Sequence, residues 1–378
     1  MSCKLDKLIA KLCPDGVEYV LLYEVARISN GKDHKALTDG NIPVYGSGGI
    51  MRYANQFIFD KESVLIPRKG SISNIFYVDT PFWTVDTIFY TKIDINKIVP
   101  KYFYYYLHTQ KLEDLNTAGG VPSLTKSVLD KVKIAIPPLP IQREIVRILD
   151  NFTELTAELT AELTARKKQY EYYRDELLSF GKDVPIVTLG SISFTTSTGV
   201  TPLAGNSEYY GGRIPWLRTQ EVRFVDIWDT EMRVTEKALN ETSLKWIPAN
   251  CVIVAISGAT AGRVGINKIP LTTNQHCCCF EINGDKALYR YVFHCLSNTN
   301  DELLKLKQGA RGDLNAGMIK RFTIPLPSLE EQERIVAILD RFDTLTTNIT
   351  NGLPAEITAR QKQYEYYRDK LLTFKEIA

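Results

Sequence analysis

Two stretches of the chain concentrate polar side chains in segments rich in turns, and these side chains could contact nucleic acid. Arginine and lysine can grip phosphates or bond guanine, asparagine and glutamine suit adenine, and the hydroxyl and glycine N–H groups of tight turns suit phosphate. Interleaved aromatic residues could pack on a sugar or on an exposed base. The candidate DNA-contacting residues are Ser47, Arg52, Arg68, Lys69, Ser71, Asn74 and Lys126 in the first stretch, and Arg218, Thr219, Gln220, Ser257, Thr260, Arg263, Asn274, Arg311 and Asn315 in the second. The aromatic candidates are Tyr45, Phe82, Trp83, Tyr209, Tyr210 and Trp216.

Signatures of catalysis are missing from the sequence. There is no G-x-x-x-x-G-K-[ST] phosphate loop, no G-x-S-x-G elbow, and no Asn-Pro-Pro-aromatic or Asp-Pro-Pro-aromatic tetrad of an amino-methyltransferase. The His276–Cys279 run, with His294 and Cys295 nearby, could bind zinc, but its counterpart in the first stretch is the apolar run 88–90. The alignment favours a core strand over a metal site, because buried cysteine behaves as a small hydrophobe.

Length and composition indicate a globular protein of two or three domains. The chain has 378 residues, of which 44% are hydrophobic and 24% charged, and the net charge is +2. No apolar run approaches the ~20 residues that span a bilayer, and the N-terminal segment does not resemble a secretory signal. Seven cysteines without framework spacing suggest reduced thiols, so we expect a cytoplasmic protein.

The chain contains an internal repeat that defines its expected organisation. The segment IPPLPIQREIVRILDNF…ARKKQYEYYRDELLSF matches IPLPSLEEQERIVAILDRF…ARQKQYEYYRDKLLTF, and the second copy holds four more residues between the matching ends. Fainter matches link the two turn-rich stretches. The expected segments are a lead-in helix (1–16), a first globular unit (17–135), a first helical region (136–180), a second globular unit (181–323) and a second helical region (324–378).

The helical regions carry an amphipathic pattern that predicts long helices. Apolar residues from Ile141 to Leu177 recur at steps of three and four, with Pro140 at the start and Gly181 as a stop. The centre holds a tandem Thr-Ala-Glu-Leu (156–163), and each such unit lengthens a helix by about 6 Å. In the second region, Asn351-Gly352-Leu353-Pro354 predicts a break or kink. We expect the two regions to bury their apolar stripes against each other as an antiparallel coiled coil.

The globular units have patterns of mixed α and β structure. We expect strands at 64–66, 75–78, 87–91, 251–256 and 276–281, and helices at 100–110 and 289–306. The predicted fold is therefore α+β: two similar mixed α/β recognition domains, separated by two long helical regions in an antiparallel coiled coil, with a pseudo-twofold internal repeat.

The whole pattern resembles the DNA-specificity subunit of type I restriction–modification systems. The most specific residues are the paired KKQYEYYRD (167–175) and KQYEYYRDK (362–370), the matching REIVRILD and RIVAILD runs, and the Thr-Ala-Glu-Leu tandem. The resemblance implies that each globular unit reads one half of an asymmetric, bipartite double-stranded DNA target, and that the number of tandem units sets the gap. It also implies two methylation subunits docked on the helical regions and two motor-nuclease restriction subunits docked on that core. The candidate docking and spacer residues are Leu155, Leu159, Leu163, Tyr170, Tyr173, Tyr364 and Tyr367.

On this interpretation the chain is not an enzyme and needs no cofactor or metal of its own. S-adenosylmethionine, ATP and Mg²⁺ would belong to the partner subunits, and no membrane partner is expected. Two alternatives stay open at this point. One is an adaptor that binds proteins through its helical regions without reading DNA. The other is a stand-alone nuclease using scattered carboxylates such as Asp86, Glu221 or Asp226.

Overall fold

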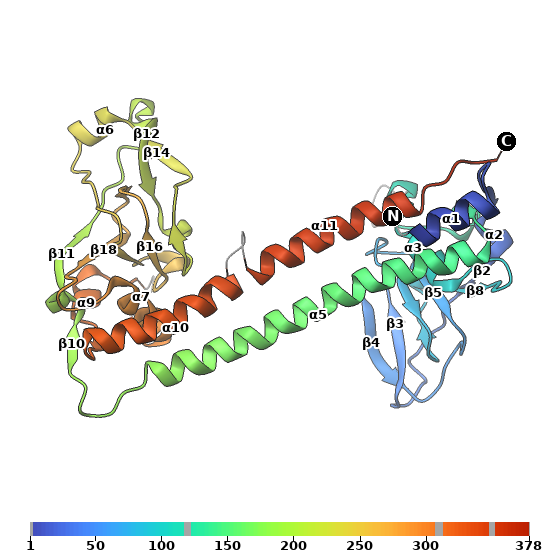
Figure 1. Cartoon of the computed structure of the whole chain (residues 1–378), viewed down its shortest axis with the longest axis horizontal. Coiled ribbons are helices and arrows are strands. Elements are labelled where there is room, and N and C mark those ends of the chain that lie inside the picture. Colours follow the sequence, from blue (N-terminus) through green and yellow to red (C-terminus); the bar gives the residue numbers. More distant parts are fainter. Residues whose placement is uncertain (1–2, 117–121, 307–312, 348–351, 378) are drawn as a thin grey trace. The chain divides into compact units, whose positions relative to one another are not determined.

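The computed structural model describes residues 3–116, 122–306, 313–347 and 352–377, which form two compact units (Figure 1). Unit 1 comprises Met1–Thr160 and Glu356–Ala378, and unit 2 comprises Ala161–Ala355. The long helix α5 (Leu139–Leu177) contributes its first part to unit 1 and its second part to unit 2. No helix of the described ranges is long and apolar enough to cross a membrane.

Unit 1 is built on three small sheets with helices against them. The four-stranded sheet has the order β2-β8-β5-β6 and the three-stranded sheet the order β4-β3-β7, while β1 pairs with β9. The strands are β1 (Glu18–Leu21), β2 (Ala26–Asn30), β3 (Ile42–Gly46), β4 (Gly49–Ala54), β5 (Ser63–Pro67), β6 (Phe76–Val78), β7 (Trp83–Thr84), β8 (Ile88–Ile93) and β9 (Lys133–Ile136). The helices are α1 (Cys3–Leu12), α2 (Leu22–Val25), α3 (Pro100–Leu107), η1 (Leu112–Leu115), α4 (Lys126–Leu129) and α11 (Leu353–Leu371), whose first residues belong to unit 2.

Unit 2 has the same kinds of sheet. Its five-stranded sheet has the order β11-β18-β15-β16-β13, its three-stranded sheet the order β14-β12-β17, and β10 pairs with β19. The strands are β10 (Ile186–Thr188), β11 (Ser193–Thr198), β12 (Tyr210–Leu217), β13 (Asp226–Ile227), β14 (Met232–Val234), β15 (Val252–Ala255), β16 (Val264–Asn267), β17 (Thr272–Thr273), β18 (Cys277–Ile282) and β19 (Thr323–Pro325). The helices are η2 (Leu189–Ile192), η3 (Ser207–Tyr209), η4 (Thr219–Glu221), α6 (Glu236–Glu241), η5 (Gly258–Thr260), α7 (Tyr289–Asn298), α8 (Asn300–Lys305), α9 (Ala316–Arg321) and α10 (Leu329–Thr347).

Strand pairing repeats between the units residue by residue. In unit 1, β3 pairs with β4 antiparallel and with β7 parallel, and in unit 2, β12 pairs in the same way with β14 and β17. The parallel registers are Val44 with Trp83 and Trp216 with Thr272. The faint sequence match between the globular units therefore corresponds to a shared order of strands.

A buried glutamine fixes the start of each helical region against its globular unit. The Gln142 side chain accepts a hydrogen bond from the Val99 N–H at 2.8 Å and donates to two carbonyls. Gln332 does the same with the Leu288 N–H at 2.9 Å. Both glutamines are fully buried, so these amides satisfy backbone groups that water cannot reach.

The helical regions pack through matching aromatic pairs within each unit. In unit 1 the Phe152 ring stacks on Tyr367 with centroids 5.5 Å apart, and in unit 2 the Tyr173 ring stacks on Phe342 at 5.6 Å. The second region consists of two helices, α10 and α11, with Pro354 in the first turn of α11, which agrees with the predicted break. Asn351 lies outside the described residues.

Most predicted elements of the globular units are present. The five predicted strands correspond to β5, β6, β8, β15 and β18. The predicted helix 289–306 is wrong in one respect: it is two helices, α7 and α8, separated at Thr299. The cysteine run lies in β18 with Cys277–Cys279 buried, as expected of a core strand.

Candidate nucleic-acid interface

Most of the unit 1 candidates gather where several loops meet beyond the ends of the strands. The loop after β5 contains Arg68 and Lys69, and its backbone bonds to the segment before α4, because Leu124 N–H donates to the Arg68 carbonyl at 2.8 Å. From the same loop, the Asn74 amide donates to the Ser47 carbonyl in the β3–β4 turn at 3.4 Å. Lys126 begins α4 immediately after that segment. The sequence separated these residues by up to 79 positions, and the fold brings them to one edge.

This loop edge offers cations and hydroxyls to solvent. Lys69, Ser71, Asn74 and Lys126 are exposed. The Arg68 guanidinium lies over the Phe89 ring at 5.1 Å, and its Nε atom is buried without a hydrogen-bond partner among the described residues. Stacking on an aromatic ring orients the guanidinium and leaves its outer N–H groups available to an acceptor.

Arg52 belongs to a different part of unit 1. Its Nη2 atom donates to the Leu37 carbonyl at 2.9 Å and to the Asp39 carboxylate at 3.2 Å. The structure thus uses this guanidinium to hold the loop before β3, and does not place it with the other candidates.

A cavity of about 740 Å³ opens beside this edge. It is lined by the 33–35 loop, the β3–β4 turn and the loop before β8, and includes His34, Ser47, Asp86 and Thr87. His34 and its neighbours Asp33 and Lys35 were not among the sequence candidates, because nothing local links them to Ser47.

Unit 2 presents the corresponding edge with different side chains. Leu314 N–H donates to the Ile256 carbonyl at 2.8 Å, as Leu124 does to Arg68, so Ser257 takes the place of Lys69. Thr260 Oγ1 donates to the Ser257 carbonyl at 3.3 Å, which closes the short η5 turn. Arg263 follows this turn and is half-buried.

The other unit 2 candidates have structural partners. Arg218 donates to Glu231 at 2.8 Å and lies 3.7 Å from Glu221, so its charge is already paired. The Asn315 side chain caps α9 by accepting from the Met318 N–H at 2.9 Å. Asn274 is 8% exposed and accepts from the His276 N–H at 3.1 Å. Thr219 is half-buried and Gln220 is exposed in the η4 turn, whereas Arg311 lies outside the described residues.

Two of the aromatic candidates are in the core, contrary to the expectation that they pack on DNA. Phe82 is fully buried and Trp216 is 4% exposed. The Trp216 indole N–H donates to the Val200 carbonyl at 3.1 Å, and the Trp83 indole N–H donates to the Lys32 carbonyl at 3.0 Å. Side chains alternate between the two faces of a strand, and the residue type alone does not show whether an aromatic side chain faces the core or the solvent.

No group of three metal-ligating side chains occurs among the residues that the structure describes. Burial raises the pKa of the Cys278 thiol to about 12. This thiol is fully buried, as expected of a residue in a core strand.

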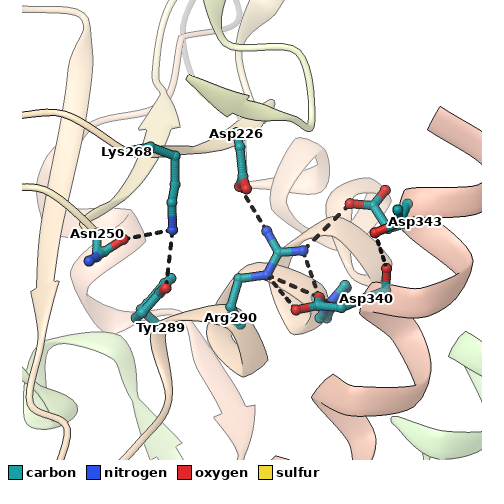
Figure 2. A network of polar contacts seen from close by, with 9 residues as sticks. Asp226, Asn250, Lys268, Tyr289, Arg290, Asp340 and Asp343 are labelled. Atoms are coloured by element: carbon teal, nitrogen blue, oxygen red, sulfur yellow. Dashed lines mark hydrogen bonds and ion pairs between the residues drawn. The ribbon is translucent and has the colours of Figure 1, made fainter. Parts of the chain in front are cut away.

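A partly buried ion cluster joins α7 to α10 within unit 2 (Figure 2). Arg290 of α7 contacts Asp340 at 2.6 Å, Asp226 at 2.8 Å and Asp343 at 3.5 Å, and is 14% exposed. His294, fully buried one turn further along α7, contacts Asp340 at 2.7 Å. Burial opposes ionisation of Asp340, but hydrogen bonds from His294 and Arg290 outweigh it and lower its pKa.

Unit 1 has the same connection in a simpler form. Asp150, the repeat partner of Asp340, accepts from Lys101 at 2.8 Å and from the Tyr105 hydroxyl at 2.6 Å. The Lys101 side chain is 39% exposed, so this contact is far more solvated than that of Arg290. In each unit, a helix of the globular part (α3 or α7) thus contacts an equivalent aspartate of the helical region.

The candidate docking residues on the helices differ in exposure. Tyr170 and Tyr364 are half-buried, and burial raises the pKa of each to about 12. Tyr173 is 38% and Leu155 36% exposed, whereas Leu159, Leu163 and Tyr367 are half-buried. The neighbouring Tyr172 and Tyr366 are more than 60% exposed and were missed, although the paired YEYY motif contained them.

Comparison with known proteins identifies the family. The type I restriction modification DNA specificity domain matches residues 14–166 and again 182–359. The chain therefore belongs to the family of type I restriction–modification specificity subunits, which confirms the resemblance found in the sequence.

Individual relatives cover most of the chain. The type I restriction enzyme EcoR124I/EcoR124II specificity subunit of Escherichia coli is 40% identical over 297 residues, 75% of this chain and 73% of that protein. A putative type I restriction enzyme specificity subunit of Haemophilus influenzae is 32% identical and aligns over 95% of this chain and 96% of its own length. Among solved structures, the S subunit of a type I restriction–modification system from M. genitalium has a TM-score of 0.66 at 14% identity and covers 95% of this chain and 97% of that one.

Proposed function

We propose that this chain is the sequence-specific DNA-binding subunit of a type I restriction–modification complex, and that each recognition domain reads one half of an asymmetric bipartite target. The observation that carries the proposal is the pair of equivalent loop edges. Both edges sit on the same strand order, yet Lys69 of unit 1 corresponds to Ser257 of unit 2. One scaffold with two different sets of polar side chains is what reading two different half-sequences requires.

In this proposal residues 17–135 and 181–323 are the recognition domains, and 136–180 and 324–378 are the helical regions. The helical regions form an antiparallel coiled coil related by a pseudo-twofold axis. The equivalent aromatic pairs Phe152–Tyr367 and Tyr173–Phe342 support this arrangement. The continuous helix through the Thr-Ala-Glu-Leu tandem supports a role as the spacer that sets the gap.

The partners in this proposal are double-stranded DNA, two methylation subunits on the helical regions and two restriction subunits. The chain itself is non-catalytic, as the names of its relatives as specificity subunits support. S-adenosylmethionine, ATP and Mg²⁺ act in the partner subunits, and the complex works in the cytoplasm. The exposed tyrosines of the paired YEYY motifs, Tyr172 and Tyr366, support docking of partner proteins on the helical regions.

Deleting Thr160–Leu163 tests the proposal. Four residues shorten a helix by about 6 Å, and one base pair of B-DNA rises about 3.4 Å, so the gap should fall by one or two base pairs. The assay is methylated-adenine mapping in DNA from cells that express the chain with its methylation subunits. Both half-sequences should stay unchanged. A deletion that alters the half-sequences and keeps the gap would contradict the spacer role, and the absence of any sequence preference in the parent complex would contradict DNA reading.

A further inference from the structure

Unit 2 contains an open groove between the end of α5 and the start of α10. The cavity measures about 670 Å³ and is lined by Tyr173, Leu177, Phe180, Arg334, Ile338 and Phe342, among others. Its apolar wall comes from both helices, and Arg334 lies at its rim with a side chain that is 54% exposed.

The equivalent site in unit 1 is covered by the chain's own α1. By the internal repeat, Glu144 corresponds to Arg334 and Leu371 corresponds to Leu177. Lys4 of α1 contacts Glu144 at 2.8 Å, and Leu5 of α1 is fully buried in the same core cluster as Leu371. Figure 1 shows α1 beside the first turns of α5 and the end of α11.

Equivalent side chains are more buried in unit 1, where α1 covers the site, than in unit 2. The Glu144 side chain is 3% exposed, against 54% for Arg334. Leu371 is 4% exposed, whereas Leu177 is only half-buried. The same residues of the repeat therefore form a filled site in unit 1 and an unfilled one in unit 2.

The charge at the rim is reversed between the two sites. In unit 1 the carboxylate of Glu144 lies between two cations, Arg147 and Lys4. In unit 2 the Arg334 guanidinium pairs with Glu331 at 2.7 Å, and Glu176 also lines the cavity, which lies open where Lys4 and α1 cover unit 1. A second copy of α1 would bring Lys4 against Arg334, and like charges at this distance repel.

We propose that the unit 2 groove binds an amphipathic helix of a different protein, with leucine or isoleucine residues on one face and a carboxylate where α1 has Lys4. The helix would lie as α1 lies in unit 1, with its apolar stripe on Leu177, Ile338 and Phe342. The carboxylate would complete an acid–base–acid arrangement with Arg334 and Glu331. This inference rests on the proposed docking of partner proteins on the helical regions, and it does not depend on the proposal that the chain reads DNA.

The test uses two stapled, fluorescent helical peptides and the full chain. One has the sequence of residues 2–13 with Cys3→Ser and Cys13→Ser, and the other also carries Lys4→Glu. A photoreactive group in each peptide allows mapping of the contact by mass spectrometry. The Lys4→Glu peptide should bind about five-fold more tightly, since an attractive pair replaces a repulsive one at a partly exposed site.

Variants of the chain make the result decisive. Arg334→Glu should reverse the order of the two affinities, and Ile338→Asp should abolish both. Glu333→Gln, an exposed neighbour facing away from the groove lining, should change neither. Cross-links should fall within 169–180 and 331–342. Equal affinities, an order unaffected by Arg334→Glu, or cross-links elsewhere would overturn the inference, while methylation mapping would still report separately on DNA reading.

Discussion

Replacing Asp340 with asparagine should loosen the second recognition domain from α10. Asp340 receives two bonds from Arg290 Nε, at 3.0 and 3.1 Å, and one from Nη2 at 2.6 Å, besides the His294 contact at 2.7 Å. Breaking a buried ion pair costs about 3–5 kcal/mol. Asp340 is 35% exposed and Asp226 and Asp343 remain beside Arg290, so we expect a loss of about 2 kcal/mol.

The matched control is Asp150→Asn in unit 1. Its partner Lys101 is 39% exposed, so the loss there should be about 1 kcal/mol or less. Native-state hydrogen exchange measures the local opening in each unit separately, which avoids assuming a single unfolding step for the whole chain. Exchange of the protected α7 and α10 amides should rise about 30-fold in Asp340→Asn, and that of α3 about five-fold or less in Asp150→Asn.

The reasoning would be refuted if the two variants had equal effects, or if Asp150→Asn had the larger one. Either result would mean that the partly buried guanidinium of Arg290 does not depend on Asp340 for its charge balance. Arg290→Lys provides a further check, because lysine cannot contact Asp226 and Asp340 with a planar fork. Its effect should be close to that of Asp340→Asn.

Three other perturbations have defined outcomes. The hydrogen bond from Arg147 is the largest influence on the pKa of Glu144; together with Lys4 it outweighs burial and lowers this pKa to about 2. The ionised carboxylate therefore stabilises the fold above the ordinary pKa near 4.3, and this stabilisation is lost as the pH falls through 2. In urea titrations, the difference in unfolding free energy between the wild type and Glu144→Gln should shrink over that pH range. Gln332→Ala leaves the Leu288 N–H buried without an acceptor, so urea unfolding should show that the free energy of unfolding falls by about 2–3 kcal/mol. A much smaller loss would mean that water solvates this N–H in the variant. The double change of Lys69 and Lys126 to alanine should weaken binding of the assembled complex to all duplexes alike and reduce the salt slope by about 2; an unchanged slope would place neither lysine on phosphate.

The sequence predicted the long helices and five of the strands because their signals are local. The spacing of apolar residues from Ile141 to Leu177 and the run at Cys277–Cys279 are patterns within one element, and the corresponding helix and strand are present. The internal repeat also paired Asp150 with Asp340 correctly as equivalent positions. What the repeat could not give was the partner of each, since Lys101 and Arg290 lie about 50 residues earlier in the chain.

The candidate interface was only partly predictable for the same reason. Arg68, Lys69 and Asn74 share one loop, and their common edge follows from the sequence. Arg218 looked equally available, yet Glu231, thirteen residues away, pairs with its guanidinium. His34 was missed because it meets Ser47 only through the fold. A polar residue type predicts what a side chain could bind, whereas its availability depends on neighbours from distant segments.

The threonines of the spacer tandem are satisfied within their own helix. Thr156 Oγ1 donates to the Phe152 carbonyl at 2.9 Å, and Thr160 Oγ1 donates to the Thr156 carbonyl at 2.8 Å. Each four-residue unit is therefore preceded by a helical carbonyl that accepts from its threonine hydroxyl. If the tandem sets the gap as proposed, adding or removing one unit changes the spacing of the DNA target and keeps these hydroxyls paired within the helix.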